Sequence, residues 1–273
     1  QLAVCREFLE EHNRESTKPL DIVLFKEAIE HISAISRVLS MPRGHIMLVG
    51  VKSSGRKSLA RLSMPISSME PYEIHITRTY GLLEWRDDLK TLMKQLGMNN
   101  LETAFLISDS QIIGDFQLED LSNLLINGEI PNLFERDEIE KIKSDLTTAE
   151  LLTDEDPWLL FTTRIKANLH IILIFSPYGN VFRHSLLSFP ALRTETTIDW
   201  FMPWSLDALN SVGQASLMSA QLGSVKTMKS IVSVCVNIHK SVEDQSTKFF
   251  NETKRFTACT PSRYFDLLTT FIK

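Results

Sequence analysis

Short apolar runs alternate with stretches of helical periodicity along most of the chain. Three runs, at residues 46–49, 104–107 and 170–175, predict buried strands, because each is continuously apolar or nearly so and ends at turn residues. Helical spacing predicts helices at residues 20–40, 56–64, 82–96 and 118–125, and residues 73–77 are a further candidate strand. This alternation predicts a doubly wound α/β domain with a parallel sheet.

The pattern changes after Trp204, where residues 205–271 contain no convincing strand and are expected to form several helices. We therefore predict two domains, residues 1–202 and residues 203–273. A long amphipathic helix is expected near the end, because apolar residues recur there at spacings of three, four and seven: Ile231, Cys235, Ile238, Val242, Phe249 and Phe256. We expect this face to pack on its own domain rather than in an intermolecular coiled coil, and Pro261 to open a final short helix.

Composition and charge narrow the classes of function. The chain has 29 lysine and arginine residues against 34 aspartate and glutamate residues, so its net charge of −5 gives no bulk attraction to nucleic acid or to a membrane surface. No apolar run reaches the roughly 18 to 20 residues that cross a bilayer, and His170, inside the best run, is interpreted as a core histidine. Three widely spaced cysteines favour a reducing, intracellular setting. The lack of a membrane-spanning run predicts a soluble chain. No secretory signal is visible, and the chain begins at Gln1 rather than Met, so we expect a piece of a longer protein.

A loop between the first predicted strand and the next helix carries the strongest chemical signal. Residues 50–58 read Gly-Val-Lys-Ser-Ser-Gly-Arg-Lys-Ser, and a loop in this context turns backbone N–H groups toward an anion at the positive end of a helix. The usual pattern has Lys and then Ser or Thr after the second glycine, whereas this chain has Arg56 and Lys57. Arg56 keeps the positive charge, but Lys57 removes the hydroxyl that ligates magnesium, and Ser58 is rotated away by about 100°. We favour nucleotide binding, with an empty structural turn as the alternative.

Asp109 follows the second predicted strand, where a nucleotide hydrolase places the carboxylate that organises magnesium. The next residue, Ser110, stands where a glutamate usually polarises the attacking water, and a hydroxyl cannot act as that base. Hydrolysis is therefore expected to be slow or absent, and no catalytic residue is assigned. The alternative interpretation of Asp109 is a helix N-cap.

Further motifs stand around this loop and Asp109, at residues 42–45, 80–81, 85–89, 108–112, 128–134, 169–182 and 198–201. Together they strongly resemble the fourth AAA+ module of axonemal dynein heavy chains, and the likeness spans nearly the whole chain. Residues 260–264 resemble the family segment just before the coiled-coil stalk. The resemblance implies a P-loop AAA+ module with a large α/β nucleotide-binding subdomain at residues 1–202 and a small helical lid subdomain at residues 203–273.

The resemblance also implies which residues hold ATP or ADP, with or without magnesium, between the two subdomains. Asp109 matches the magnesium position, and Arg263 lies one place beyond the usual lid arginine, which is Ser262 here. The segment that lines the adenine matches Ile22, Val23 and Leu24. The phosphate loop matches Lys52, Ser53, Ser54, Gly55, Arg56, Lys57 and Ser58.

Departures from the family pattern point away from hydrolysis. Arginine at position 56 agrees with the axonemal modules, but Lys52 and Ser53 replace glycines, which makes positive φ angles costlier and is expected to lower affinity. Ser176 replaces an asparagine that reads the γ-phosphate, and Glu195 falls near the position of an arginine finger.

Three hypotheses follow. We favour a regulatory or structural module that binds nucleotide and hydrolyses it poorly, and the second hypothesis is a nucleotide-free scaffold. The third is an active ATPase that uses Asp115 or Glu119 as its base. The resemblance implies neighbouring AAA+ modules of the same heavy chain as partners, a microtubule reached through the downstream stalk, and a location in the cytoskeleton of a ciliary or flagellar axoneme.

Overall fold

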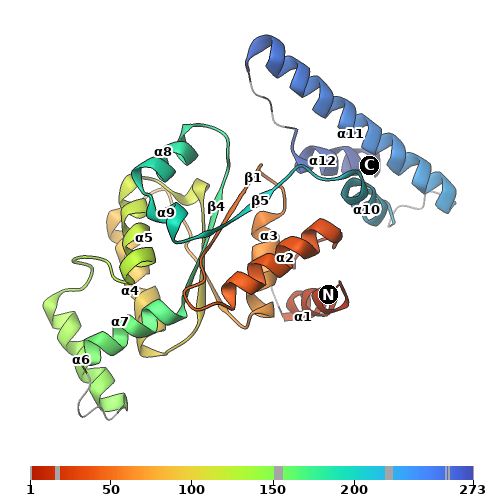
Figure 1. The fold of residues 1–273 in the computed structure, drawn as a ribbon. Helices are drawn as coiled ribbons and strands as arrows, with labels where there is room; N and C mark the ends of the chain where they lie inside the picture. Colours follow the sequence, from red (N-terminus) through yellow and green to blue (C-terminus); the bar gives the residue numbers. More distant parts are fainter. Residues whose placement is uncertain are drawn as a thin grey trace. The chain divides into compact units, whose positions relative to one another are not determined.

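The computed structural model contains a five-stranded sheet with the strand order β2-β3-β4-β1-β5 (Figure 1). The strands are β1 (Ile46–Gly50), β2 (Glu70–Glu73), β3 (Thr103–Ser108), β4 (Leu169–Phe175) and β5 (Thr197–Phe201). The β1–β4, β3–β4 and β2–β3 pairs are parallel, and Thr197 N donates to His45 O at 2.9 Å beside β1. This sheet confirms the predicted α/β class.

The structure describes residues 2–15, 19–150, 156–218, 224–255, 257 and 259–272. Its internal contacts divide the chain into two units. Unit 1 comprises Gln1–Ile32, Gly50–Leu59 and Trp200–Lys273, and unit 2 comprises Ser33–Val49 and Ala60–Asp199. These units do not follow the ranges 1–202 and 203–273, so the subdomain assignment stays a prediction.

The strands predicted from continuous apolar runs are confirmed, since β1 and β4 are buried at every position. The strand predicted at residues 73–77 is misplaced, because β2 ends at Glu73. The reason lies at the next carbonyl, where Ile74 O accepts a hydrogen bond of 2.6 Å from Gln111 Nε2 instead of continuing the ladder. The edge strand β5 was not predicted, because most of its residues are exposed and its sequence lacks a continuous apolar run.

Helices flank these strands along the chain (Figure 1). They are α2 (Lys26–Leu39), α3 (Arg56–Ile66), α4 (Leu82–Met98), the short η1 (Asp109–Gln111), α5 (Asp115–Asn127), α6 (Arg136–Glu150), α7 (Pro157–Asn168), α8 (Asn180–Ser188) and α9 (Ala191–Thr194). The predicted helices at 56–64, 82–96 and 118–125 are confirmed. The helix predicted from residue 20 begins only at Lys26, because the Asn13 side chain bonds both Leu20 N, at 2.6 Å, and Leu20 O, at 3.1 Å, and so holds this segment outside a helix.

Two buried histidines link the start of β1 to the start of β4 within unit 2 through hydrogen bonds. Ile171 N donates to His45 Nδ1 at 3.0 Å, and His170 Nδ1 lies 3.0 Å from Gly44 O. Both side chains are almost fully buried. The interpretation of His170 as a core histidine is therefore confirmed.

Unit 1 contains α1 (Leu2–Glu15), α10 (Leu206–Leu217), α11 (Val225–Thr253) and α12 (Pro261–Ile272). The C-terminal helices were predicted, including the start of the last one at Pro261. Their core joins Leu209, Val212, Leu217, Val232, Cys235, Val236, Tyr264 and Leu268. The expected packing of the long helix is wrong for its second half, where Ile238, Val242 and Phe249 remain 44%, 49% and 44% exposed. Phe256 lies outside the described residues.

Candidate functional site

The loop after β1 has the strand–loop–helix geometry that its sequence predicts. Gly50 is required at the entrance, because a Cβ there would lie 2.7 Å from the Cβ of Phe201. Ser53 and Gly55 adopt positive φ angles of 62° and 92°, and α3 begins at Arg56. Ser53 thus adopts a left-handed conformation that glycine would adopt at a lower cost in conformational energy.

Side chains of this loop point in different directions. Lys52 and Ser53 are exposed, whereas Ser54 is only 4% exposed and its Oγ has no hydrogen-bond partner among the described residues. Arg56 is also buried, and its Nη2 donates to Val51 O in the same loop at 3.0 Å. One guanidinium N–H of Arg56 is therefore used to hold the loop's own backbone.

A cavity of about 330 Å³ within unit 1 opens beside the loop. Four separate segments line it, and they supply Asp21, Ile22, Val23, Phe25 and Ala28; Ser53, Ser54, Gly55, Ser58 and Leu59; Trp204 and Val212; and Ser262, Phe265 and Asp266. The structure thus joins Ile22 and Val23 of the predicted adenine segment to four residues of the predicted phosphate loop. The other predicted residues of unit 1 are not on this lining: Leu24, Lys52, Arg56, Lys57 and Arg263.

Sequence reasoning missed the aromatic and acidic parts of this cavity. Trp204 makes edge-on contacts with Phe25, at 5.4 Å between ring centroids, and with Phe265, at 5.8 Å. Asp21 and Asp266 add two carboxylates, while no described lysine or arginine lines the cavity. A signal for Asp266 was available, since it lies four residues after Ser262 on α12 and shares its helical face.

Ser262 and Arg263 differ in their position relative to the cavity. Ser262 lines the cavity, and its Oγ lies 2.8 Å from Thr260 Oγ1. Arg263 is exposed on the first turn of α12. A one-residue shift at a helix start therefore puts a hydroxyl, not a guanidinium, against the cavity.

Asp109 belongs to unit 2, at the carboxyl end of β3. Its Oδ2 accepts a hydrogen bond of 2.8 Å from Ser176 N, directly after β4. The alternative interpretation as an N-cap is wrong, because Ser108 caps η1 and Asp109 is its first residue. Within the described parts of the chain, no group of three or more His, Cys, Asp or Glu side chains is placed to hold a metal ion.

The predicted base and finger positions lie at the surface of unit 2. Ser110 is exposed, and its Oγ lies 2.8 Å from Ser108 Oγ. Glu195 is exposed just after α9 and accepts a hydrogen bond from Thr194 Oγ1. On α5, Asp115 and Glu119 are exposed, and Asp115 Oδ2 lies 3.5 Å from His184 Nε2.

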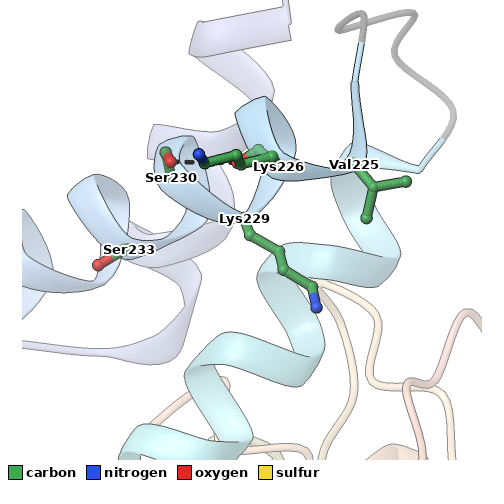
Figure 2. A pocket seen from close by; sticks show the side chains of 5 residues that line it. All are labelled: Val225, Lys226, Lys229, Ser230 and Ser233. Atoms are coloured by element: carbon green, nitrogen blue, oxygen red, sulfur yellow. Dashed lines mark hydrogen bonds between the residues drawn. The ribbon is translucent and has the colours of Figure 1, made fainter.

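A larger but open hollow of about 600 Å³ lies at the start of α11 (Figure 2). It is bordered by Val225, Lys226, Lys229, Ser230 and Ser233, and Ser230 Oγ donates a hydrogen bond of 3.1 Å to Lys226 O. All five side chains are exposed, and no predicted site residue is among them. The smaller cavity at the loop is therefore the better candidate site.

Comparison with known proteins decides the family. Residues 20–273 match the family described as the P-loop containing dynein motor region D4. The chain belongs to the dynein heavy chain family. This module is 41% identical over 90% of its length to the dynein-1-beta heavy chain of the flagellar inner arm I1 complex from Chlamydomonas reinhardtii, and 39% identical over 97% of its length to dynein axonemal heavy chain 2 from Homo sapiens.

The module spans only 6% of each of these two relatives. Among solved structures, it is similar to the Hsp104:casein complex from S. cerevisiae in its extended conformation, with a TM-score of 0.49 and 13% identity over 95% of this chain and 38% of that one. In the described residues, no helix is both long enough and apolar enough to span a membrane.

Proposed function

We propose that this dynein module binds ATP or ADP in the 330 Å³ cavity and hydrolyses it little or not at all. The observation that carries the proposal is the meeting of Ile22 and Val23 with the glycine- and serine-containing loop around one cavity. Its volume is at the lower end of the range of small-molecule sites, which is about 300 to 1,000 Å³. Apolar and aromatic walls suit an adenine, and loop N–H groups suit phosphate oxygens.

The loop itself fits a phosphate group. Ser54 offers a buried hydroxyl that lacks a described partner, and the space above Gly55 is open, since a Cβ there would meet only Leu59 Cγ at 3.9 Å. A bound nucleotide would supply the oxygens on which magnesium sits. Lys57 in place of a hydroxyl residue leaves that metal with one protein ligand fewer than the usual loop provides.

Poor hydrolysis follows from the groups present at the strand ends. Ser110 has no carboxylate with which to accept a proton from water. Asp109 uses one carboxylate oxygen to accept the Ser176 N–H, and Glu195 places negative charge where a finger would need positive charge. Binding and orientation of nucleotide are thus retained in the proposal, without activation of water.

The proposal is tested by calorimetric titration with ADP and ATP, with and without magnesium, alongside a phosphate-release assay. Val23→Glu places a charge in the cavity and is expected to weaken binding at least tenfold. Val225→Glu is the matched control, because Val225 is 67% exposed and does not line this cavity. Equal binding by both variants would contradict the assigned cavity, and turnover of about 1 s⁻¹ or faster, as in ordinary enzymes, would contradict the absence of hydrolysis.

A second candidate function, the nucleotide-free scaffold, is favoured by two observations. Asp21 and Asp266 put negative charge on the cavity wall, where it opposes phosphate, and Arg56 bonds the loop backbone. The same titration separates the two candidates. The scaffold predicts no heat of binding and no displacement of a fluorescent ADP analogue.

We further propose that the chain works as one AAA+ module in the motor ring of an axonemal dynein heavy chain. Its partners would be neighbouring modules of the same heavy chain, and it would act on the microtubule only through the stalk that follows. Residues 1–202 and 203–273 would be its large subdomain and lid. Support comes from the axonemal relatives, and a tagged heavy chain that localised outside ciliary or flagellar axonemes would contradict the assignment.

A further inference from the structure

A second cavity within unit 1, of about 230 Å³, adjoins the candidate nucleotide cavity. Its wall includes the start of α2, the loop residue Ser54 and residues 200–205. It is smaller than the usual range for nucleotide-sized ligands. We propose that this cavity binds the guanidinium group of an arginine side chain presented by a partner polypeptide.

Negative charge in the cavity comes from α2. Glu27 and Glu30 both line it, and their spacing of three places them on one face of the helix. A hydrogen bond from the Ser205 side chain holds the pKa of Glu27 below its usual value, so this carboxylate stays ionised at neutral pH. Glu30 has an exposed Lys26 at 3.8 Å, and no described lysine or arginine lines the cavity.

Aromatic rings also line this cavity. Trp200 and Trp204 line the cavity together with Phe25, and Trp200 is 50% exposed. A guanidinium plane is attracted to the face of an indole ring, and it is less strongly hydrated than an ammonium group. An ionised carboxylate beside aromatic rings therefore favours an arginine side chain over a phosphate or a neutral ligand.

Ser54 lines both cavities, so in the absence of nucleotide its hydroxyl is open to a polar ligand in this one. Its side chain is 4% exposed and lines the cavity, yet its Oγ has no hydrogen-bond partner among the described residues. A buried hydroxyl left without a partner costs stability, and its lone pairs can accept an N–H from a guanidinium. A guanidinium has five N–H donors, which is enough for bonds to a carboxylate and to a hydroxyl.

The test is a titration of the 273-residue chain with N-acetyl-arginine-amide in the absence of nucleotide, followed by tryptophan fluorescence and calorimetry. A ligand of this size is expected to bind with a Kd in about the millimolar range. N-acetyl-citrulline-amide has the same shape without the charge and is expected to bind at least tenfold more weakly. Equal binding of the two compounds, or no saturable binding of the arginine compound, would overturn the proposal.

Variants locate the site. Glu27→Gln keeps an acceptor for Ser205 and is expected to weaken arginine binding at least tenfold, and Glu30→Gln is expected to weaken it in the same direction. Asp207→Asn is the matched control, since Asp207 is an exposed first-turn carboxylate of α10 that does not line the cavity. Unchanged binding in both glutamine variants would overturn the proposal, and thermal melts verify that each variant is folded. Because nucleotide is absent, the result is independent of whether the module binds ATP or ADP.

Discussion

At the scale of single residues, the phosphate loop stores backbone strain at Ser53. A left-handed conformation destabilises a residue with a Cβ by roughly 1–2 kcal/mol. Glycine avoids this strain, but it loses more conformational entropy on folding, which costs about 0.5–1 kcal/mol. Ser53, at a φ of 62°, is therefore expected to gain about 0.5–1 kcal/mol of stability when replaced by glycine. Urea unfolding measures the difference.

Lys52 provides the neighbouring control for Ser53→Gly. It is exposed and is not among the described residues with positive φ, so Lys52→Gly brings only the entropic cost and is expected to lower stability. Destabilisation of both variants by the same amount would show that the loop does not store strain at Ser53.

At the scale of elements, the sequence predicts what local pattern decides and misses what distant contacts decide. The strands β1 and β4 were predictable because their runs are apolar throughout, whereas the exposed edge strand β5 lacks that pattern. Helical spacing before Lys26 was misleading because bonds from Asn13 on α1 hold Leu20. The loop at residues 50–58 could be predicted from its glycines. The positions of Trp204 and Asp266 in the cavity could not, because they depend on contacts between segments that are distant in the sequence.

Helix α6 is joined to α4 by a carboxylate shared between two lysines. Glu138 Oε2 lies 2.7 Å from Lys90 Nζ, and Oε1 lies 3.7 Å from Lys94 Nζ. The hydrogen bond from Lys90 lowers the pKa of Glu138, so its contribution is present above the usual glutamate pKa and is lost as the pH falls through the lowered one. Because the group is about one-third exposed, Glu138→Gln is expected to cost about 1 kcal/mol in urea unfolding at pH 7, more than the exposed control Glu140→Gln. A difference that did not shrink in 1 M salt would contradict an ionic origin.

At the scale of the whole molecule, the buried His45 is expected to make unfolding depend on pH. Burial, together with the charges of His170 and Arg43, lowers the pKa of His45 from 6.5 to about 4. Its Nδ1 must stay unprotonated to accept the Ile171 N–H. Between pH 6.5 and pH 4, His45 therefore binds a proton in the unfolded chain but not in the folded chain. The resulting stability is complete above pH 6.5 and is lost as the pH falls toward 4, by about 2 kcal/mol between pH 7 and pH 5.

Other groups titrate over the same range, including His170, whose pKa burial also lowers, so the effect of His45 is isolated by comparison with a variant. His45→Asn keeps an acceptor near the position of Nδ1 but cannot take up a proton at these pH values. Urea unfolding at pH 7 and pH 5 should show a loss of stability for the unsubstituted chain that exceeds the loss for His45→Asn by about 2 kcal/mol. Equal losses would mean that His45 takes up its proton alike in both states, and the bond to Ile171 would then not be what joins the starts of β1 and β4 at neutral pH.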